Sequence, residues 1–131
     1  MAEASYPDDL KYHEEHDWAR IEDGEATFGI TWYAQDALGE VVFFDPPEIG
    51  AQVTKDESYA EVESVKAVSD VFAPLSGEIM AVNEALGESP EKINEDPYGD
   101  GWLVRVRLSD PSEADSLLDA DAYGKLLQSG S

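Results

Sequence analysis

Residues 63–70 read Glu63-Ser64-Val65-Lys66-Ala67-Val68-Ser69-Asp70, and Lys66 lies near the middle of this run. The flanking segments, Ser58 to Glu63 and Val68 to Ala73, have the composition and alternation typical of strands. Two such runs separated by a few residues predict a β-hairpin with Lys66 at its tip. A lysine at a hairpin tip offers a primary amine on a flexible stem, and this amine can be acylated.

Lysine is scarce in this chain, which makes Lys66 conspicuous. There are five lysines against 30 acidic residues, and Lys66 is the only lysine between Lys55 and Lys92. Spacing alone nevertheless leaves open an ordinary exposed lysine in a turn.

The wider run from Tyr59 to Glu78 resembles the lipoylation hairpin of glycine cleavage system H proteins. The resemblance is carried by residues 63–70 and by the turn that follows, Pro74-Leu75-Ser76-Gly77-Glu78. It implies that Lys66 carries lipoic acid through an amide bond. It also implies that a lipoate-attaching enzyme reads the residues around the lysine, namely Glu63, Ser64, Val65 and Ala67.

The length of 131 residues fits a single domain, and 42% hydrophobic residues with three tryptophans supply enough apolar material for a core. Within this domain we expect an acidic leader over residues 1–11. A lipoyl-type β core is expected over about 12–108, and C-terminal helices over about 109–128.

The formal net charge of −22 restricts the classes of partner. A surface so acidic repels phosphate backbones and anionic lipids, so we expect neither nucleic-acid nor membrane partners. Its self-repulsion strains the compact state unless salt screens it, and the Debye length falls to about 3 Å at 1 M salt. We therefore expect a halophilic source and lower stability in low salt.

The chain has no cysteine, so it forms neither disulfides nor thiolate metal sites, and any redox sulfur must arrive on a cofactor. Its first nine residues are acidic and lack an apolar core, unlike a secretory signal or a basic transit peptide. No run approaches the length of a membrane span. The expected location is the cytoplasm.

The remaining patterns predict a mostly β fold. Trp18 to Glu22 and Glu25 to Ile30 flank Asp23-Gly24 and predict a hairpin, and Thr31 is expected to cap a short helix that ends at Gly39. The strand patterns that begin at Gly39 and Gly77 lie 38 positions apart and suggest an internal duplication. We expect a flattened barrel or a sandwich of two small sheets with approximate two-fold symmetry, as in lipoyl and biotinyl carriers, plus short helices.

Two helix starts are predicted in the second half of the chain. Ser89-Pro90 is typical of a cap followed by proline at the first helical position. Asp110 with Glu113 suggests a capping box, and a last helix from about Asp121 would bury Tyr123. The pattern from Asn94 to Trp102 strengthens the family resemblance, which extends over roughly residues 12–127.

His13 and His16 lie three positions apart among carboxylates, a spacing that metal ligands can have, but no second ligand cluster follows. A solvated charged stretch is the alternative, and we expect no metal. His16-Asp17-Trp18 also resembles a His-Glu-Trp segment of H proteins. This likeness implies that Asp17 lies near the aminomethyl-loaded arm, although aspartate is one methylene shorter than glutamate.

No catalytic constellation is evident, since the chain lacks a cysteine nucleophile and a glycine-rich phosphate loop. The resemblance implies a non-catalytic carrier whose lipoyl-lysine arm moves an aminomethyl group and reducing equivalents. Its implied partners are a pyridoxal-phosphate glycine decarboxylase, a tetrahydrofolate-dependent aminomethyltransferase and dihydrolipoyl dehydrogenase, together with the lipoate-attaching enzyme.

Other interpretations stay open. A biotinyl carrier shares the fold but usually flanks its lysine with methionines, where this chain has Val65 and Ala67. A lipoyl domain of a 2-oxo acid dehydrogenase usually has aspartate before the lysine. An H-like lipoyl donor or regulatory scaffold, or a structural β domain with an incidental lysine, also fits the sequence.

Overall fold

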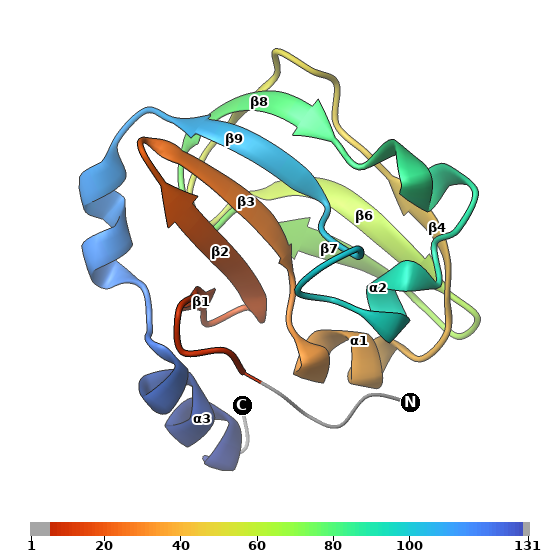
Figure 1. Cartoon of the computed structure of the whole chain (residues 1–131). Coiled ribbons are helices and arrows are strands. Elements are labelled where there is room, and N and C mark those ends of the chain that lie inside the picture. Colours follow the sequence, from red (N-terminus) through yellow and green to blue (C-terminus); the bar gives the residue numbers. More distant parts are fainter. Residues whose placement is uncertain (1–5, 130–131) are drawn as a thin grey trace.

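The computed structural model describes residues 6–129, which form two antiparallel β-sheets with short helices at their ends (Figure 1). The larger sheet has six strands in the order β1-β2-β3-β9-β8-β5, and the smaller has three in the order β4-β6-β7. The prediction of a mostly β fold built from two sheets is confirmed. The sheets do not close into a barrel, and they are unequal in size.

The strands of the larger sheet are β1 (Lys11–His13), β2 (Asp17–Glu22), β3 (Glu25–Ile30), β5 (Gln52–Val53), β8 (Gly77–Val82) and β9 (Val104–Leu108). Those of the smaller sheet are β4 (Val41–Asp45), β6 (Ser58–Ser64) and β7 (Val68–Phe72). The helices are α1 (Trp32–Leu38), α2 (Lys92–Glu95) and α3 (Ala120–Gln128), with 3-10 turns η1 (Glu84–Gly87) and η2 (Pro111–Ser116).

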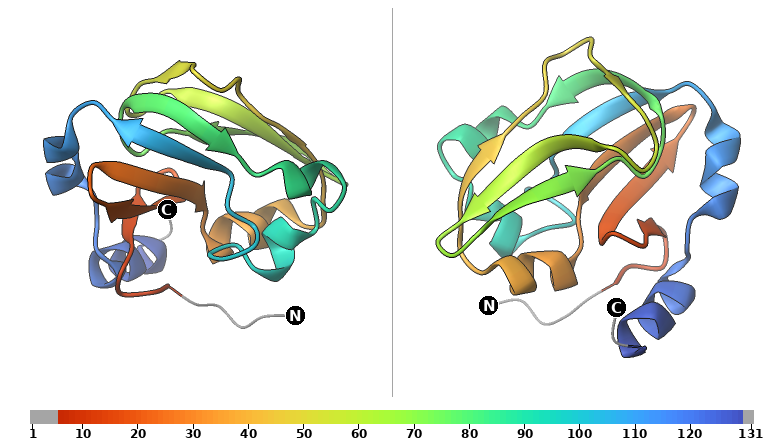
Figure 2. Two further views of the ribbon diagram at one scale, coloured as in Figure 1. Left: turned by 45° about the horizontal axis from the view of Figure 1, so that its top comes forward. Right: turned by 180° about the vertical axis from the view of Figure 1, so that it is seen from behind.

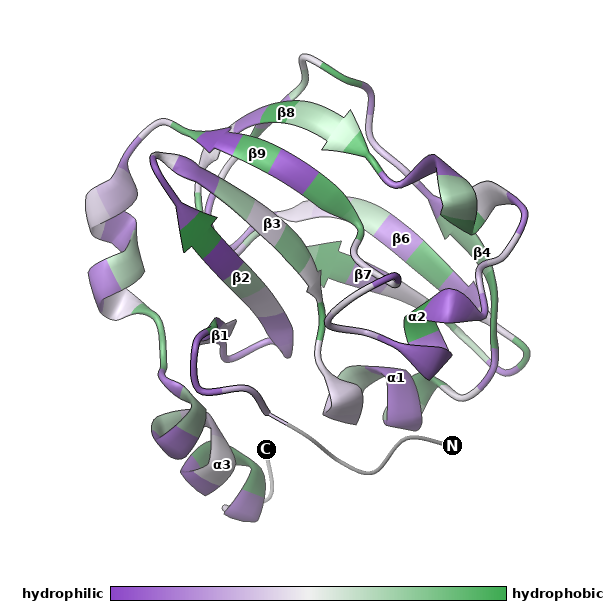
Figure 3. Ribbon diagram, viewed as in Figure 1, coloured by the Kyte–Doolittle hydropathy of each residue, from purple (hydrophilic) through white to green (hydrophobic). Residues whose placement is uncertain are grey.

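The main core lies between the two sheets, as the turned views show (Figure 2). Alternation puts one side of each strand into it: along β9, Val104, Val106 and Leu108 are buried while Arg105 and Arg107 are exposed, a pattern visible in Figure 3. Such a strand buries apolar side chains on one face and keeps charge in water. The two arginines therefore lie on the outer face, as their alternation predicts.

A second, smaller cluster joins the start of the chain to its last helix. Tyr12 stacks on Tyr123 of α3 with ring centroids 4.8 Å apart, and Leu10 and Trp18 are buried beside them. The backbone of Tyr12 also forms a bridge with Leu118. Residues 1–5 of the predicted leader lie outside the described residues, whereas its end, from Leu10, packs against the fold.

The first predicted hairpin and helix are confirmed. β2 and β3 pair around Asp23-Gly24, where both residues have positive φ. Thr31 caps α1 by accepting a hydrogen bond from the backbone N–H of Ala34 at 3.2 Å, and Gly39 ends the helix at φ 82°.

Two helix starts differ from the prediction. α2 begins at Lys92, so Pro90 lies before the helix and the capping position falls on Glu91 instead of Ser89. Glu91 makes no side-chain capping bond. Asp110 caps the 3-10 turn η2, but Glu113 does not reach back to it. The Glu113 carboxylate instead accepts bonds from the N–H of Ser76 at 2.8 Å and from its hydroxyl at 2.9 Å. A tertiary contact has replaced the local one.

The two halves of the predicted duplication lie in different sheets. β4 pairs with β6 in the smaller sheet, and β8 pairs with β9 and β5 in the larger.

Within residues 6–129, no helix is long and apolar enough to cross a membrane.

Candidate functional site

The turn between β6 and β7 carries Lys66, as the sequence predicts. The two strands pair antiparallel up to Glu63 and Val68, and the connecting loop projects from the body of the molecule (Figure 2). Lys66 is exposed, and no hydrogen bond or ion pair joins its Nζ to any residue between 6 and 129. Its amine is therefore accessible to another molecule.

Ser64 fixes the shape of this turn from inside. Its hydroxyl accepts hydrogen bonds from the backbone N–H groups of Lys66, at 3.2 Å, and Ala67, at 3.1 Å. Its own N–H donates to the carbonyl oxygen of Ala67 at 2.8 Å. The N–H of Val65 donates to the carbonyl oxygen of Glu40 at 3.0 Å, which ties the turn to the start of β4. Backbone bonds on both sides hold Lys66 outward.

The stem of Lys66 lies beside the end of α1. A Cβ atom added to Gly39 would come 3.4 Å from Cε of Lys66, so the glycine leaves room for the lysine stem. Gly39 also has positive φ, which disfavours other residues there. The helix end and the lysine turn therefore form one local unit.

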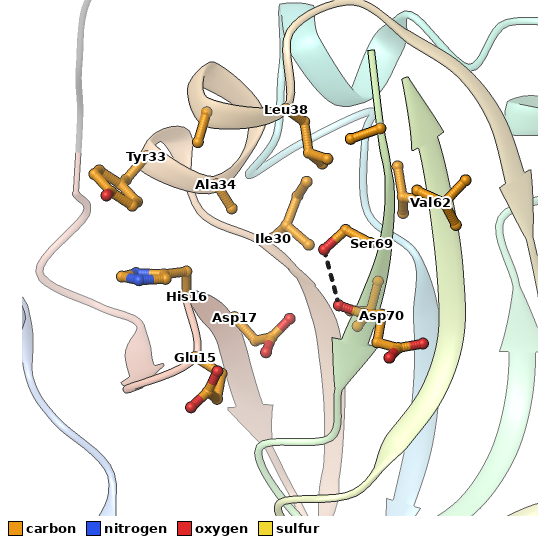
Figure 4. A pocket seen from close by; sticks show the side chains of 14 residues that line it. Glu15, His16, Asp17, Ile30, Tyr33, Ala34, Leu38, Val62, Ser69 and Asp70 are labelled. Atoms are coloured by element: carbon orange, nitrogen blue, oxygen red, sulfur yellow. Dashed lines mark hydrogen bonds between the residues drawn. The ribbon is translucent and has the colours of Figure 1, made fainter. Parts of the chain in front are cut away.

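A cleft of about 300 Å³ lies next to this unit, and we call it the hairpin cleft (Figure 4). Its walls come from the start of β2, from α1 and from β7, with an apolar side formed by α1 and an acidic side formed by β2 and β7. Its lining residues are Glu15, His16, Asp17, Ile30, Tyr33, Ala34, Ala37, Leu38, Val62, Ala67, Val68, Ser69, Asp70 and Val71. None of these lining residues is a lysine or an arginine.

Asp17 is the buried acid of this cleft. Its side chain is 1% exposed, and its Oδ2 has no hydrogen-bond partner. Burial raises the pKa of Asp17 well above its usual range, although the backbone N–H of Phe72, which donates to the carboxylate, opposes this shift. The Tyr59 hydroxyl is also buried without a partner, and burial raises the pKa of Tyr59 too, with the Asp17 charge adding to the effect. Asp17 thus holds a proton more tightly than a carboxyl in water.

His16 forms another part of the cleft wall. Its backbone has φ 75°, its ring lies against Tyr33 with centroids 4.5 Å apart, and its Nδ1 lies 2.7 Å from the hydroxyl oxygen of Tyr123. The same hydroxyl lies 2.8 Å from Oγ1 of Thr31. Burial lowers the pKa of His16, which favours the neutral imidazole. The last helix is thereby connected to the cleft.

The two histidines do not form a metal site. Nε2 of His13 lies 2.6 Å from Oδ1 of Asp56, while His16 contacts Tyr123. No group of three or more potential ligands is arranged to hold a metal ion anywhere in the described part of the chain.

A second hollow, of about 330 Å³, lies on the other side of α1 and is lined by Gln35, Asp36, Gly39, Glu40, Glu91, Asn94 and Glu95. The side chain of Asn94 connects α1 to the start of β4 in this hollow. Its Nδ2 donates to Oε1 of Gln35 and to the carbonyl oxygen of Gly39, and its Oδ1 accepts from the N–H of Val41. These bonds fix the position of Gly39 beside Lys66.

The structure brings Asp17 into the same cleft as Ala67 and Val68 of the lysine turn. Sequence reasoning did not identify His16, Tyr33 or Asp70 as cleft residues. For Asp70 the sequence held a signal, because it lies two positions after Val68 and side chains at this spacing on a strand share a face. For His16 the unusual backbone angle leaves no recognisable mark in the sequence.

Comparison with known proteins gives a consistent result. The family model described as "Glycine cleavage H-protein" matches residues 10–130. The glycine cleavage system H protein of Halorhodospira halophila is 57% identical over 122 residues, which are 92% of this chain and 94% of that protein. That of Symbiobacterium thermophilum is 50% identical over 127 residues, covering 97% and 99% of the two chains. The crystal structure of a glycine cleavage system H protein from Mycobacterium marinum superimposes with a TM-score of 0.85 at 42% identity, covering 95% and 99%.

Proposed function

The chain belongs to the glycine cleavage H-protein family, the lipoyl carriers of the glycine cleavage system, and on this premise we propose that Lys66 is its lipoyl attachment site. The observation that carries the proposal is the exposed lysine at the end of the β6–β7 hairpin, held outward by Ser64. A compact body that presents one mobile arm is suited to successive encounters, because tethering raises the effective concentration of the carried group.

The residues around Lys66 fit a lipoyl group. The amine is accessible, and the adjacent hairpin cleft offers an apolar wall from α1 and Ile30 that suits an alkyl chain and a sulfur ring. When bound, the lipoyl group supplies a dithiolane that accepts and releases electrons and a one-carbon unit, chemistry that a chain without cysteine lacks. The chain's own part is to hold and present the attachment point.

Recognition by a lipoate-attaching enzyme is assigned to four residues. Val65 and Ala67 are exposed on either side of the lysine, and Glu63 is half-buried on β6, so an enzyme can touch all three. Ser64 is buried and contributes through the shape it gives the turn. We expect loss of Ser64 to slow attachment without removing any contact to the enzyme.

Asp17 is proposed to contact a cationic amine carried on the arm. The hairpin cleft is lined by Asp17, Glu15 and Asp70, and among the residues described no lysine or arginine lines it. Oδ2 of Asp17 is unpartnered and able to accept a hydrogen bond. Burial of this carboxyl favours its neutral form, whereas an incoming cation would oppose that effect and favour its ionisation.

The family makes the chain a carrier component, and we propose that it has no catalytic activity of its own. Its proposed partners are glycine decarboxylase, aminomethyltransferase, dihydrolipoyl dehydrogenase and the lipoate-attaching enzyme. Meeting them in turn favours small interfaces, at or below roughly 1,200 Å². We propose a cytoplasmic location, and the net charge predicts a halophilic source.

Intact-mass measurement of the protein from its own host tests the attachment. A lipoyl-sized addition mapped to Lys66 is expected. The Lys66→Arg variant should carry none, whereas Lys125→Arg, which changes an exposed lysine far from the turn, should be modified as in the wild type. An unmodified Lys66, or a biotin-sized addition there, would overturn the assignment.

Glycine-dependent reduction of NAD by the four purified components then tests the carrier role. The lipoylated wild type should support turnover, and Lys66→Arg should reduce it to background. Turnover at the wild-type rate without Lys66 would point to a scaffold instead.

A further inference from the structure

Exposed apolar side chains gather around the lysine turn. Five large hydrophobic residues are exposed within the described residues, and only Ile49 lies away from the turn. The other four define what we call the tip patch: Val42, Phe43, Val65 and Val68. A cluster of exposed apolar side chains on a protein this charged marks an interaction surface.

A β-bulge in β4 creates half of this patch. Val41 pairs with Ser64 and Phe43 pairs with Glu63, so Val42 is an extra residue on its strand. In a regular strand neighbouring side chains point to opposite faces, yet both Val42 and Phe43 are exposed, at 46% and 50%. A bulge re-aims side chains in this way and is typical of functional edges.

The strand register places the patch on one face beside Lys66. Phe43 lies directly opposite Glu63, and Glu63 lies directly opposite Val68, so the three side chains form a row across the smaller sheet. Val68 is two residues from Lys66, and Val65 precedes it. The two valines therefore flank the lysine, and the row continues to Phe43.

A row of carboxylates borders the row of Phe43, Glu63 and Val68. Asp45 pairs with Glu61, and Glu61 pairs with Asp70, two residues further along each strand, about 7 Å away. All three are exposed, and no ion pair neutralises any of them within residues 6–129. Carboxylates directly opposite one another repel, so this row costs stability in the free protein.

We propose that this face is the docking surface for the enzyme that acylates Lys66, and that this enzyme presents an apolar depression bordered by basic side chains. The inference rests on the proposed attachment at Lys66. Phe43 is the main anchor, and Val68 lies at the other end of its row, across Glu63. Val42 and Val65 add apolar surface beside them, and the row of Asp45, Glu61 and Asp70 steers the basic border into place.

The position of the patch selects this partner over those that act on the loaded arm. The acylating enzyme must bring its active site to Nζ of Lys66, which is only four methylene carbons from the backbone, so its surface has to cover the turn itself. A partner that acts at the far end of a long arm can dock further away. Charge complementarity then sets the association rate, and the apolar anchor sets the lifetime of the complex.

The test is binding of the unmodified chain to a purified lipoate-attaching enzyme. Lys66→Arg serves as the background, because it allows binding without turnover. In the Lys66→Arg background, Phe43→Thr should raise the Kd for the lipoate-attaching enzyme about tenfold, as expected for the main anchor. Ile49→Thr, which removes an apolar side chain that is more exposed than Phe43 and lies away from the turn, should leave Kd unchanged. Phe43→Leu should restore most of the affinity.

In the chain with Lys66 intact, the rate of the mass increase gives a second readout. Phe43→Thr should raise the KM of the enzyme for this chain about tenfold and leave kcat within about twofold. Complete modification at high enzyme concentration would show that the variant folds and that the attachment site holds.

The outcomes separate this inference from the proposed function. Equal Kd for Phe43→Thr and the background would overturn it while leaving Lys66 as the attachment site. Unchanged Kd with weaker binding to glycine decarboxylase would assign the patch to that enzyme, which also overturns it. A wild-type chain that gains no mass would instead overturn the attachment.

Discussion

The hydroxyl of Tyr123 lies 2.7 Å from Nδ1 of His16, so the C-terminal helix holds one wall of the hairpin cleft. The same hydroxyl reaches Oγ1 of Thr31, the capping residue of α1. One buried hydroxyl thus joins three segments that are remote in sequence.

We expect Tyr123→Phe to lower the free energy of unfolding by about 1–3 kcal/mol, because Nδ1 of His16 and Oγ1 of Thr31 both lose the hydroxyl that they contact. Urea denaturation measures this. Tyr33→Phe is the control, since its hydroxyl makes no hydrogen bond in the described residues, and it should change stability by less than about 0.5 kcal/mol. Equal losses in the two variants would contradict the network.

Asp17→Asn should stabilise the fold at neutral pH, on the order of 1 kcal/mol, because it removes a buried carboxylate with an unpartnered oxygen. Since burial raises the pKa of Asp17 above its unfolded value, the folded state binds the proton more tightly. The contribution of Asp17 is therefore most favourable below the unfolded pKa and is lost as the pH rises through the folded pKa.

The gain from Asp17→Asn should accordingly grow from acid to neutral pH, which denaturation curves at about pH 4 and 7 would show. Asp115→Asn, at an exposed position outside the row of Asp45, Glu61 and Asp70, controls for the general loss of charge. A gain that is the same at both pH values would mean that the fold does not raise the pKa of Asp17 above its unfolded value.

Glu61→Gln should stabilise the protein by about 0.5 kcal/mol in low salt, because it relieves repulsion from Asp45 and Asp70 directly opposite. At 1 M NaCl, where the Debye length is about 3 Å, the gain should vanish. Glu48→Gln removes the same charge from a loop and should give a smaller gain. Thermal unfolding of both variants at the two salt concentrations tests this. A larger gain for Glu61→Gln than for Glu48→Gln in low salt would indicate repulsion within the row, and equal gains would indicate only repulsion from the net charge.

Glu113→Ala should cost about 1–3 kcal/mol, because the N–H and hydroxyl of Ser76 lose their acceptor. Asp115→Ala, an exposed acid in the same 3-10 turn, should be nearly neutral. If Glu113 acted only as a local cap, as its sequence pattern suggests, Ser76→Ala would cost as much stability in the Glu113→Ala background as in the wild type. We expect a smaller cost in that background.

Patterns local in sequence predicted much of the fold. The β2–β3 hairpin follows from Asp23-Gly24, α1 follows from Thr31 and Gly39, and the lysine turn follows from the flanking strands. Each depends on backbone preferences of adjacent residues, which the sequence states directly. Glu113 shows the limit, since a carboxylate suited to a capping box found a better partner 37 positions away.

The cleft was less accessible to sequence reasoning. The resemblance indicated Asp17, but its burial and its unpartnered oxygen depend on how the two sheets meet. The bulge that exposes Val42 and Phe43 was equally hidden, because an apolar pair in a strand gives no sign of which face each residue takes.

The Ser64 hydroxyl, which binds two backbone N–H groups of the lysine turn, has a consequence for traffic among partners. A tip of fixed shape holds a single arm in one direction, and one arm can enter only one active site at a time, so the visits of different partners exclude one another. An excess of any single visitor would therefore slow the whole cycle by occupying the carrier.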